Sequence, residues 1–252
     1  MERNELRPTT VWRFYACGHD CSAGLYNFRT MNTINPGLVR ALARVLLALS
    51  AALLALVPFS PRAAETTAPV LLVVGDSISA GYGLAPDQGW TRLLRDRLGA
   101  EGYRYRVVNA SISGDTTAGG RSRLPSLLRE HRPAVVVIEL GGNDGLRGGN
   151  VDAMRDNLDA MVTMSQKTGA RVMLVGMRMP PNYGPAYTRS FENAYAEIAR
   201  AHRVPLVPFF FEGFAESNEL FQPDRIHPTL AAQPRLLDNV WPTLKGLLDR
   251  RA

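Results

Sequence analysis

The chain has 252 residues, enough for one sizeable core, and its 46% hydrophobic and 21% charged residues are usual for a globular protein. Its formal net charge is +6, but residues 1–64 carry seven of the 29 basic and three of the 23 acidic residues. The remainder has a net charge of +2, so charge gives no reason to expect binding to nucleic acid.

The first 64 residues resemble a leader rather than a folded domain. Arg40 and Arg44 precede an apolar stretch over residues 45–59, and small residues follow as far as Ala64. A basic flank, a short apolar core and small residues are typical of a secretory signal peptide, whereas a membrane span needs about 20 apolar residues. We therefore expect a signal peptide over about residues 31–64, cleaved after Ala64.

Residues 1–30 are interpreted as a misassigned start, because Met31 lies where a signal peptide would begin. Cys17 and Cys21 both fall in this stretch, and with only His19 nearby their spacing does not predict a metal site. The mature region has no thiol for a disulfide, for cysteine catalysis or for a lipid anchor. We expect a protein without a stable membrane anchor in an oxidising compartment such as a bacterial periplasm.

From residue 68 onward, apolar runs typical of buried strands alternate with stretches of helical spacing. Strands are predicted at residues 70–74, 105–109, 134–140, 172–177 and 204–209. Helices are predicted around residues 90–98, 124–128, 151–168, 187–202 and 237–248, with interruptions at Pro125 and Pro242. The last strand contains two prolines and suits an edge position. This alternation predicts an α/β fold in which helices cover both faces of a five-stranded parallel sheet, in one domain over residues 65–252.

Polar, glycine-rich clusters follow the first three predicted strands at residues 75–77, 109–115 and 141–144. The segment 224–228, Asp-Arg-Ile-His-Pro, comes after the fifth strand. Because the carboxyl ends of parallel strands meet at one edge of the sheet, we expect these four segments to converge there.

Ser77 lies at the end of the first predicted strand and is the candidate nucleophile. A serine hydroxyl needs a base, and His227 alone among the mature histidines has a carboxylate, Asp224, three residues before it. Asp224 can orient the imidazole while the other ring nitrogen faces Ser77. Two simpler interpretations stay open: Asp76 and Ser77 cap a helix, and Asp224 only stabilises a turn. The other two histidines of this region are interpreted as solvated helix ends: His131 and His202.

An acyl-transfer site also needs hydrogen-bond donors for the oxyanion. The backbone N–H groups of Ser77 and Gly114 and the side-chain amide of Asn143 are the candidates. As alternatives, Gly114 serves only a turn of positive φ, and Asn143 only caps a loop. Asp115 and Asp144 adjoin these positions and are expected to have structural roles.

The chain resembles the GDSL or SGNH hydrolases, whose sequence blocks are similar to GDSISAGYG, SISGDTT, GGND and DRIHP here. Within that family it is most similar to the bacterial periplasmic thioesterase, arylesterase and lysophospholipase group. The resemblance implies a flavodoxin-like three-layer α/β/α sandwich. It also implies Ser77 as nucleophile, His227 as general base and acid, Asp224 as its orienting partner, and an oxyanion hole from Ser77, Gly114 and Asn143, without metal or cofactor.

The family further implies an apolar acyl-binding wall beside a glycine-rich loop over residues 145–149. The expected substrate contacts are Leu146, Met179, Pro180, Pro181 and Tyr183, although surface turns would show the same pattern. Such a wall favours medium or long acyl chains and aryl esters over sugar acetates, and the resemblance implies acyl thioesters, aryl esters and lysophospholipids as substrates. A carbohydrate acetylesterase of the same fold and a non-catalytic lipid- or glycan-binding module are the competing interpretations. The oligomeric state is not indicated.

Overall fold

The computed structural model describes residues 35–55 and 68–250. The chain divides into two units, residues 1–64 and 65–252, each described by itself. The first contains helix α1 (Pro36–Ala55). Among the described residues, no helix is long and apolar enough to cross a membrane. The predicted start at Met31, the cysteine pair and the expected cleavage site after Ala64 lie outside these residues.

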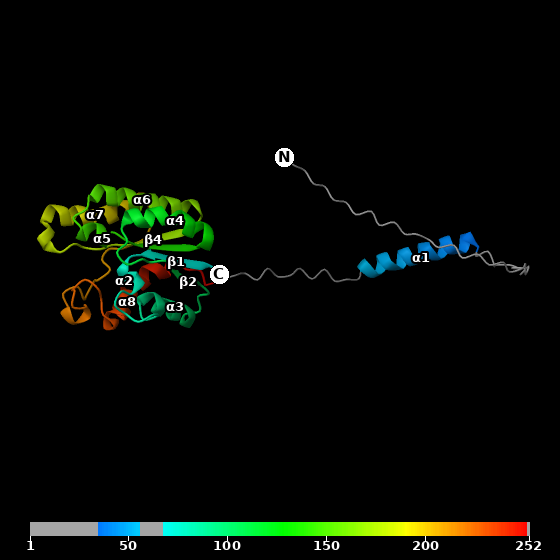
Figure 1. The fold of residues 1–252 in the computed structure, drawn as a ribbon, viewed down its shortest axis with the longest axis horizontal. Coiled ribbons are helices and arrows are strands. Elements are labelled where there is room, and N and C mark those ends of the chain that lie inside the picture. The colour runs from blue at the N-terminus through cyan, green and yellow to red at the C-terminus, as the bar shows by residue number, and fades with distance from the viewer. Residues whose placement is uncertain (1–34, 56–67, 251–252) are drawn as a thin grey trace, which may run out of the picture. The chain divides into compact units, whose positions relative to one another are not determined.

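A five-stranded sheet forms the centre of the second unit, and all of its strands are parallel (Figure 1). Its order is β2-β1-β3-β4-β5, the flavodoxin-like order. The strands are β1 (Val70–Gly75), β2 (Arg106–Asn109), β3 (Val135–Glu139), β4 (Arg171–Val175) and β5 (Leu206–Val207). Every residue of β1 and β3 is buried, as the unbroken apolar runs predict for strands covered on both faces. The predicted parallel sheet is confirmed.

Helices cover both faces of the sheet. Figure 1 shows α4, α6 and α7 on one face and α3 and α8 on the other, which confirms the three-layer sandwich. The helices are α2 (Ser77–Ala80), α3 (Trp90–Ala100), α4 (Thr117–His131), α5 (Gly142–Leu146), α6 (Val151–Lys167), α7 (Pro185–His202) and α8 (Gln233–Lys245). The short helices α2 and α5 begin directly after β1 and β3, at the edge where the polar clusters meet.

The predicted interruptions at Pro125 and Pro242 are wrong, because α4 and α8 each continue through their proline. In α4, the buried side chains of Leu124 and Leu128 lie on either side of Pro125. Their burial favours a continuous helix over the local preference of proline. In α8, buried Trp241 and Leu244 lie on either side of Pro242, and their packing likewise favours a continuous helix.

The fifth strand is much shorter than predicted. Only Leu206 and Val207 pair with β4, whereas the pattern predicts a strand over residues 204–209. Pro205 and Pro208 flank this pair and have no N–H to donate to a neighbouring strand. The residues after Pro208 therefore enter the loop at the carboxyl edge of the sheet.

Candidate active site

Strand β1 brings Ser77 to the edge of the sheet through a crowded turn at Gly75. A Cβ at Gly75 would lie 2.7 Å from Glu139 Oε2 and 2.9 Å from Ser111 Oγ, so only glycine fits. Asp76 then caps α2, because its Oδ1 accepts a hydrogen bond of 3.0 Å from the N–H of Ile78. The capping interpretation is thus correct for Asp76, and Ser77 is the first residue of the helix.

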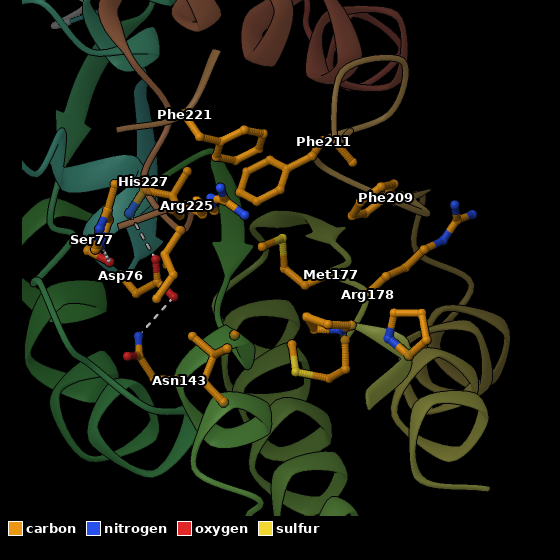
Figure 2. Close-up of a pocket in the computed structure, with 18 residues that line it drawn as sticks. Asp76, Ser77, Asn143, Met177, Arg178, Phe209, Phe211, Phe221, Arg225 and His227 are labelled. Atoms are coloured by element: carbon orange, nitrogen blue, oxygen red, sulfur yellow. Dashed lines mark hydrogen bonds between the residues drawn. The ribbon is translucent and has the colours of Figure 1, made fainter. Parts of the chain in front are cut away.

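Ser77, His227 and Asp224 lie in hydrogen-bonding contact. His227 Nε2 is 2.9 Å from Ser77 Oγ, and His227 Nδ1 is 2.7 Å from Asp224 Oδ2. Figure 2 shows the side chains of Ser77 and His227 pointing toward each other. The serine and histidine are 150 positions apart in the chain, so only the fold brings them together. This arrangement allows a proton to pass from the hydroxyl to the imidazole.

The turn that carries His227 is held from several sides. The backbone N–H of Gln222 donates to the carbonyl of His227 at 2.8 Å, and Phe221 and Pro228 form an isolated antiparallel bridge. The Gln222 amide also donates to the carbonyl of Tyr82 at 2.7 Å. The Tyr82 ring in turn lies 4.3 Å from the imidazole, centroid to centroid. These contacts join the turn to the segment that follows Ser77 and fix the imidazole.

Asp224 is held as a carboxylate. Partial burial alone would raise its pKa, but hydrogen bonds from the ring and backbone of His227 and from the N–H of Ile226 lower the pKa to about 2. Asp224 therefore stays ionised at neutral pH and can stabilise an imidazolium at His227.

Asn143 lies in α5, directly after β3, with its side chain facing Asp76. Its Nδ2 donates to Asp76 Oδ2 at 3.1 Å, the contact drawn as a dashed line in Figure 2. An amide carries two N–H groups, so the second one is available for an oxyanion. Gly114 has a φ of 79°, the left-handed turn that the alternative interpretation expects, and its carbonyl accepts a hydrogen bond from Arg147 at 3.1 Å.

Two buried carboxyl groups lie beneath this site. Burial raises the pKa of Asp76 to about 6, although the hydrogen bond from Ile78 and the nearby His227 partly offset the effect. Burial, with Asp76 beside it, also raises the pKa of Glu139, which is fully buried. Glu139 Oε2 accepts a hydrogen bond of 2.6 Å from Ser79, whose hydroxyl accepts one from the Trp90 indole at 3.1 Å. This network supports the turn between β1 and α2.

The other aspartates and histidines singled out in the sequence have local partners. Asp144 accepts hydrogen bonds from the N–H and hydroxyl of Thr117, and Asp115 forms an ion pair with Arg123 at 2.8 Å. His202 ends α7 as predicted, but it is not free in solvent, because its Nε2 lies 2.6 Å from Asp159 and its side chain is only 19% exposed. His131 is 3.7 Å from the neighbouring Glu130 and its side chain is only 18% exposed.

A cavity of about 410 Å³ opens beside Ser77, and its far wall is apolar (Figure 2). Of the predicted substrate contacts, four line it: Leu146, Met179, Pro180 and Pro181. Tyr183 does not line the cavity, and its hydroxyl donates to the carbonyl of Leu146 at 2.9 Å. Tyr187 donates to the carbonyl of Gly149 at 2.9 Å, so the two tyrosines hold both ends of this stretch of the glycine-rich loop.

Sequence reasoning missed most of the far wall of the cavity. The sequence pattern predicts Phe209 in the fifth strand and gives no role to Phe211, yet both lie in the loop after that strand and line the cavity. The signal in the sequence is the pair of prolines, Pro205 and Pro208, which indicates that the strand ends before Phe209. Other missed lining residues come from the loops after β4 and β5: Met177, Arg178, Ala215, Phe221, Arg225 and Ile226.

Residues 73–233 match the GDSL-like Lipase/Acylhydrolase family. The chain is 57% identical to Esterase TesA of Pseudomonas aeruginosa over 195 residues, which cover 77% of this chain and 96% of the relative. It is 40% identical to Thioesterase 1/protease 1/lysophospholipase L1 of Escherichia coli over 196 residues, covering 78% and 91%.

Solved structures show the same likeness. A crystal structure of TesA matches with a TM-score of 0.70 and 59% identity, over 71% of this chain and 99% of that one. The psychrotrophic esterase EstA from Pseudoalteromonas, solved in a form inhibited by monoethylphosphonate, matches with a TM-score of 0.68 and 41% identity, over 70% and 97%.

Proposed function

This chain belongs to the GDSL-like lipase/acylhydrolase family and is an ester hydrolase, and we propose that it works through an acyl-enzyme on Ser77. The observation that supports this most is the pair of contacts at His227, 2.9 Å to Ser77 Oγ and 2.7 Å to Asp224 Oδ2. Acyl thioesters, aryl esters and lysophospholipids are the proposed substrates.

In the proposed reaction, Ser77 Oγ attacks the substrate carbonyl while His227 Nε2 takes the hydroxyl proton. The oxyanion is stabilised by the backbone N–H groups of Ser77 and Gly114 and by the free N–H of the Asn143 amide. His227 then gives its proton to the leaving oxygen or sulfur, and the carbon–heteroatom bond breaks. Water, deprotonated by His227, attacks the acyl-enzyme, and the acid departs as Ser77 regains its proton.

The apolar cavity supports substrates with a hydrocarbon acyl group. Its wall includes Met177, Met179 and Phe211, side chains that gain free energy from covering an alkyl chain but offer no partner for sugar hydroxyls. A preference for medium or long acyl chains follows, and the carbohydrate acetylesterase is not favoured. We also propose export to the periplasm, on the strength of the leader pattern before residue 65.

The test is the hydrolysis of p-nitrophenyl octanoate by the protein and by its Ser77→Ala variant. The variant should lose at least about a thousandfold in kcat, keep its circular dichroism spectrum, and escape labelling by a serine-directed phosphonate. Ser111→Ala is the matched control, since Ser111 follows β2 at the same edge, and it should be active and labelled. Normal turnover by Ser77→Ala would refute the assignment.

A further inference from the structure

Among the described residues, the cavity wall includes an arginine, Arg225, whose charge no carboxylate neutralises. Arg225 lines the cavity and is exposed, and Figure 2 shows its guanidinium reaching toward the cavity from the segment that carries His227. Across residues 35–55 and 68–250, its guanidinium forms neither an ion pair nor a hydrogen bond. Its neighbour Asp224 is fully engaged, by His227 and by two backbone N–H groups.

The second arginine of the cavity is different. The Arg178 guanidinium lies 4.6 Å from the centroid of the Phe209 ring, and its nitrogens are 3.8 Å from Glu192 and 3.6 Å from Glu212. Arg178 therefore shares its charge with two carboxylates, whereas the charge of Arg225 is available to a ligand.

The backbone at Arg225 is unusual for an arginine. Its φ of 57° lies in the left-handed region, which glycine adopts at no steric cost but which is unfavourable for a residue with a Cβ. Arg132 and Arg203 share such angles, but they end helices α4 and α7, where a left-handed residue is common. Arg225 lies in a turn beside the candidate active site, where backbone strain often accompanies function.

The position of Arg225 indicates which part of a substrate it meets. His227 Nε2 must reach the departing oxygen or sulfur in order to protonate it, so the leaving group lies along the wall formed by the turn of His227. Arg225 is two residues earlier in that turn and lines the same cavity. The Asn143 side, which is proposed to bind the oxyanion, lies below this wall in Figure 2.

We propose that Arg225 is a specificity residue that binds an anionic group, a carboxylate or a phosphate, on the leaving group of the ester or thioester. This inference rests on the proposed function and adds that the preferred substrates carry a negative charge on the leaving group. Guanidinium suits both anions, because its planar N–H groups can donate two parallel hydrogen bonds to them. Neutral esters of the same acyl group are substrates too, but poorer ones.

The test compares two matched ester pairs with Arg225→Gln, Arg225→Lys and the unchanged protein. One pair is the octanoyl ester of a hydroxynitrobenzoate and its methyl ester, and the other is octanoylglycerol phosphate and octanoylglycerol. Arg225→Gln should lower kcat/KM for an anionic member about tenfold more than for its neutral partner, since a hydrogen bond to a charged group is worth about one order of magnitude or more. Arg225→Lys should recover most of that loss, and added salt should shrink it.

Arg129→Gln is the matched control. Arg129 is exposed on α4 and does not line the cavity, so this variant removes the same charge and should change neither ratio. A third pair, p-nitrophenyl glutarate and p-nitrophenyl pentanoate, carries the charge on the acyl side. In the first two pairs, the pair whose anionic member loses more kcat/KM in Arg225→Gln identifies the anion that Arg225 prefers, a carboxylate or a phosphate.

Three results would overturn the inference: equal losses for charged and neutral members in both pairs, an equal effect from Arg129→Gln, or a selective loss confined to the glutarate. A failure of the proposed function looks different, because the unchanged protein would then hydrolyse neither the neutral nor the charged esters.

Discussion

Asp76 accepts hydrogen bonds on both carboxyl oxygens, one from the side-chain amide of Asn143 at 3.1 Å and one from the backbone N–H of Ile78 at 3.0 Å. The same carboxyl group therefore caps the helix that begins with Ser77 and orients a donor of the proposed oxyanion hole. A single residue next to the proposed nucleophile holds both groups in position.

Replacing Asp76 by Asn should separate these two duties. An amide has only one oxygen acceptor, so the variant loses either the cap or the bond to Asn143. A misplaced oxyanion donor costs about a hundredfold in kcat, and KM should change little because the donor acts mainly in the transition state. Steady-state kinetics with p-nitrophenyl octanoate measure both constants.

Asp144→Asn is the control for this experiment. Asp144 follows Asn143 directly but accepts its hydrogen bonds from Thr117, so its variant should lower the melting temperature while kcat stays within a few-fold of normal. A loss of kcat as large as that of Asp76→Asn would show that the whole loop, rather than the contact with Asp76, controls the rate.

The raised pKa of Asp76 predicts how stability depends on pH. Because burial raises this pKa from 3.8 to about 6, the folded protein holds a proton between about pH 4 and pH 6 that the unfolded chain releases. The contribution of Asp76 to the free energy of unfolding should therefore fall as the pH rises through this window, by at most about 3 kcal/mol, while Glu139, whose pKa is also raised, adds a decline that the Asp76 variant keeps. Urea unfolding at several pH values measures the slope, which should be weaker in Asp76→Asn. Equal slopes would contradict the assignment of the proton to Asp76.

The pKa of Asp224 is shifted in the opposite direction from that of Asp76. It is lowered to about 2, so Asp224 is ionised at every pH at which the enzyme is assayed. Asp224→Asn should lower kcat by roughly a thousandfold at every pH from 5 to 9, because the amide cannot stabilise an imidazolium. His227→Ala should lose more, since it removes the proton acceptor itself. A loss in Asp224→Asn that disappears at high pH would contradict this role.

The cavity wall predicts a change in chain-length preference. Ala215 lines the cavity and is exposed, so Ala215→Trp can fill part of it without disturbing the core. Dodecanoyl esters should lose at least about tenfold in kcat/KM, while acetyl esters keep their rate, because only the long chain needs the filled space. Rates across a p-nitrophenyl ester series measure this change. Equal losses for all chain lengths would mean that the acyl group does not lie in this cavity.

Two helical glycines form a matched pair that tests the packing. A Cβ at Gly120 in α4 would lie 2.3 Å from Leu140 Cδ1 and 3.2 Å from Met161 Cε, whereas one at Gly99 in α3 would meet nothing within 4 Å. Gly120→Ala should lower the free energy of unfolding by about 1–3 kcal/mol, and Gly99→Ala should raise it by up to about 1 kcal/mol. Thermal and urea denaturation measure both. A stabilised Gly120→Ala variant would show that α4 packs less closely against its neighbours.

The sequence predicts the sheet well where a strand is buried on both faces, as in β1 and β3, because an unbroken apolar run has few other uses. It fails where packing overrides a local preference. Leu124 and Leu128 keep α4 helical through Pro125, and the pairing of Leu206 and Val207 ends where no further N–H is available. Neither outcome can be read from the proline alone.

For the site, the sequence predicts that four residues lie at one edge of the sheet. Ser77 and Asn143 follow strands β1 and β3, and Asp224 and His227 lie in the segment after β5. Their roles as nucleophile, donor, orienting group and base stay predictions that the variants above test. The contacts of Tyr82 and Gln222 with the turn of His227 could not be foreseen, because they depend on how two distant loops meet. The charge of Arg225 was visible in the sequence, but its lack of a partner was not.

The separation of 150 positions between Ser77 and His227 has a consequence for synthesis. A growing chain contains Ser77 long before the ribosome has added His227, and Leu236, Val240 and Leu244, which bury α8 against the sheet, are made later still. A chain that stops before Asp224 carries the Ser77 hydroxyl without the imidazole that is proposed to deprotonate it. Under the proposed mechanism an unfinished chain is therefore inactive, and ester hydrolysis begins only once the whole domain has folded.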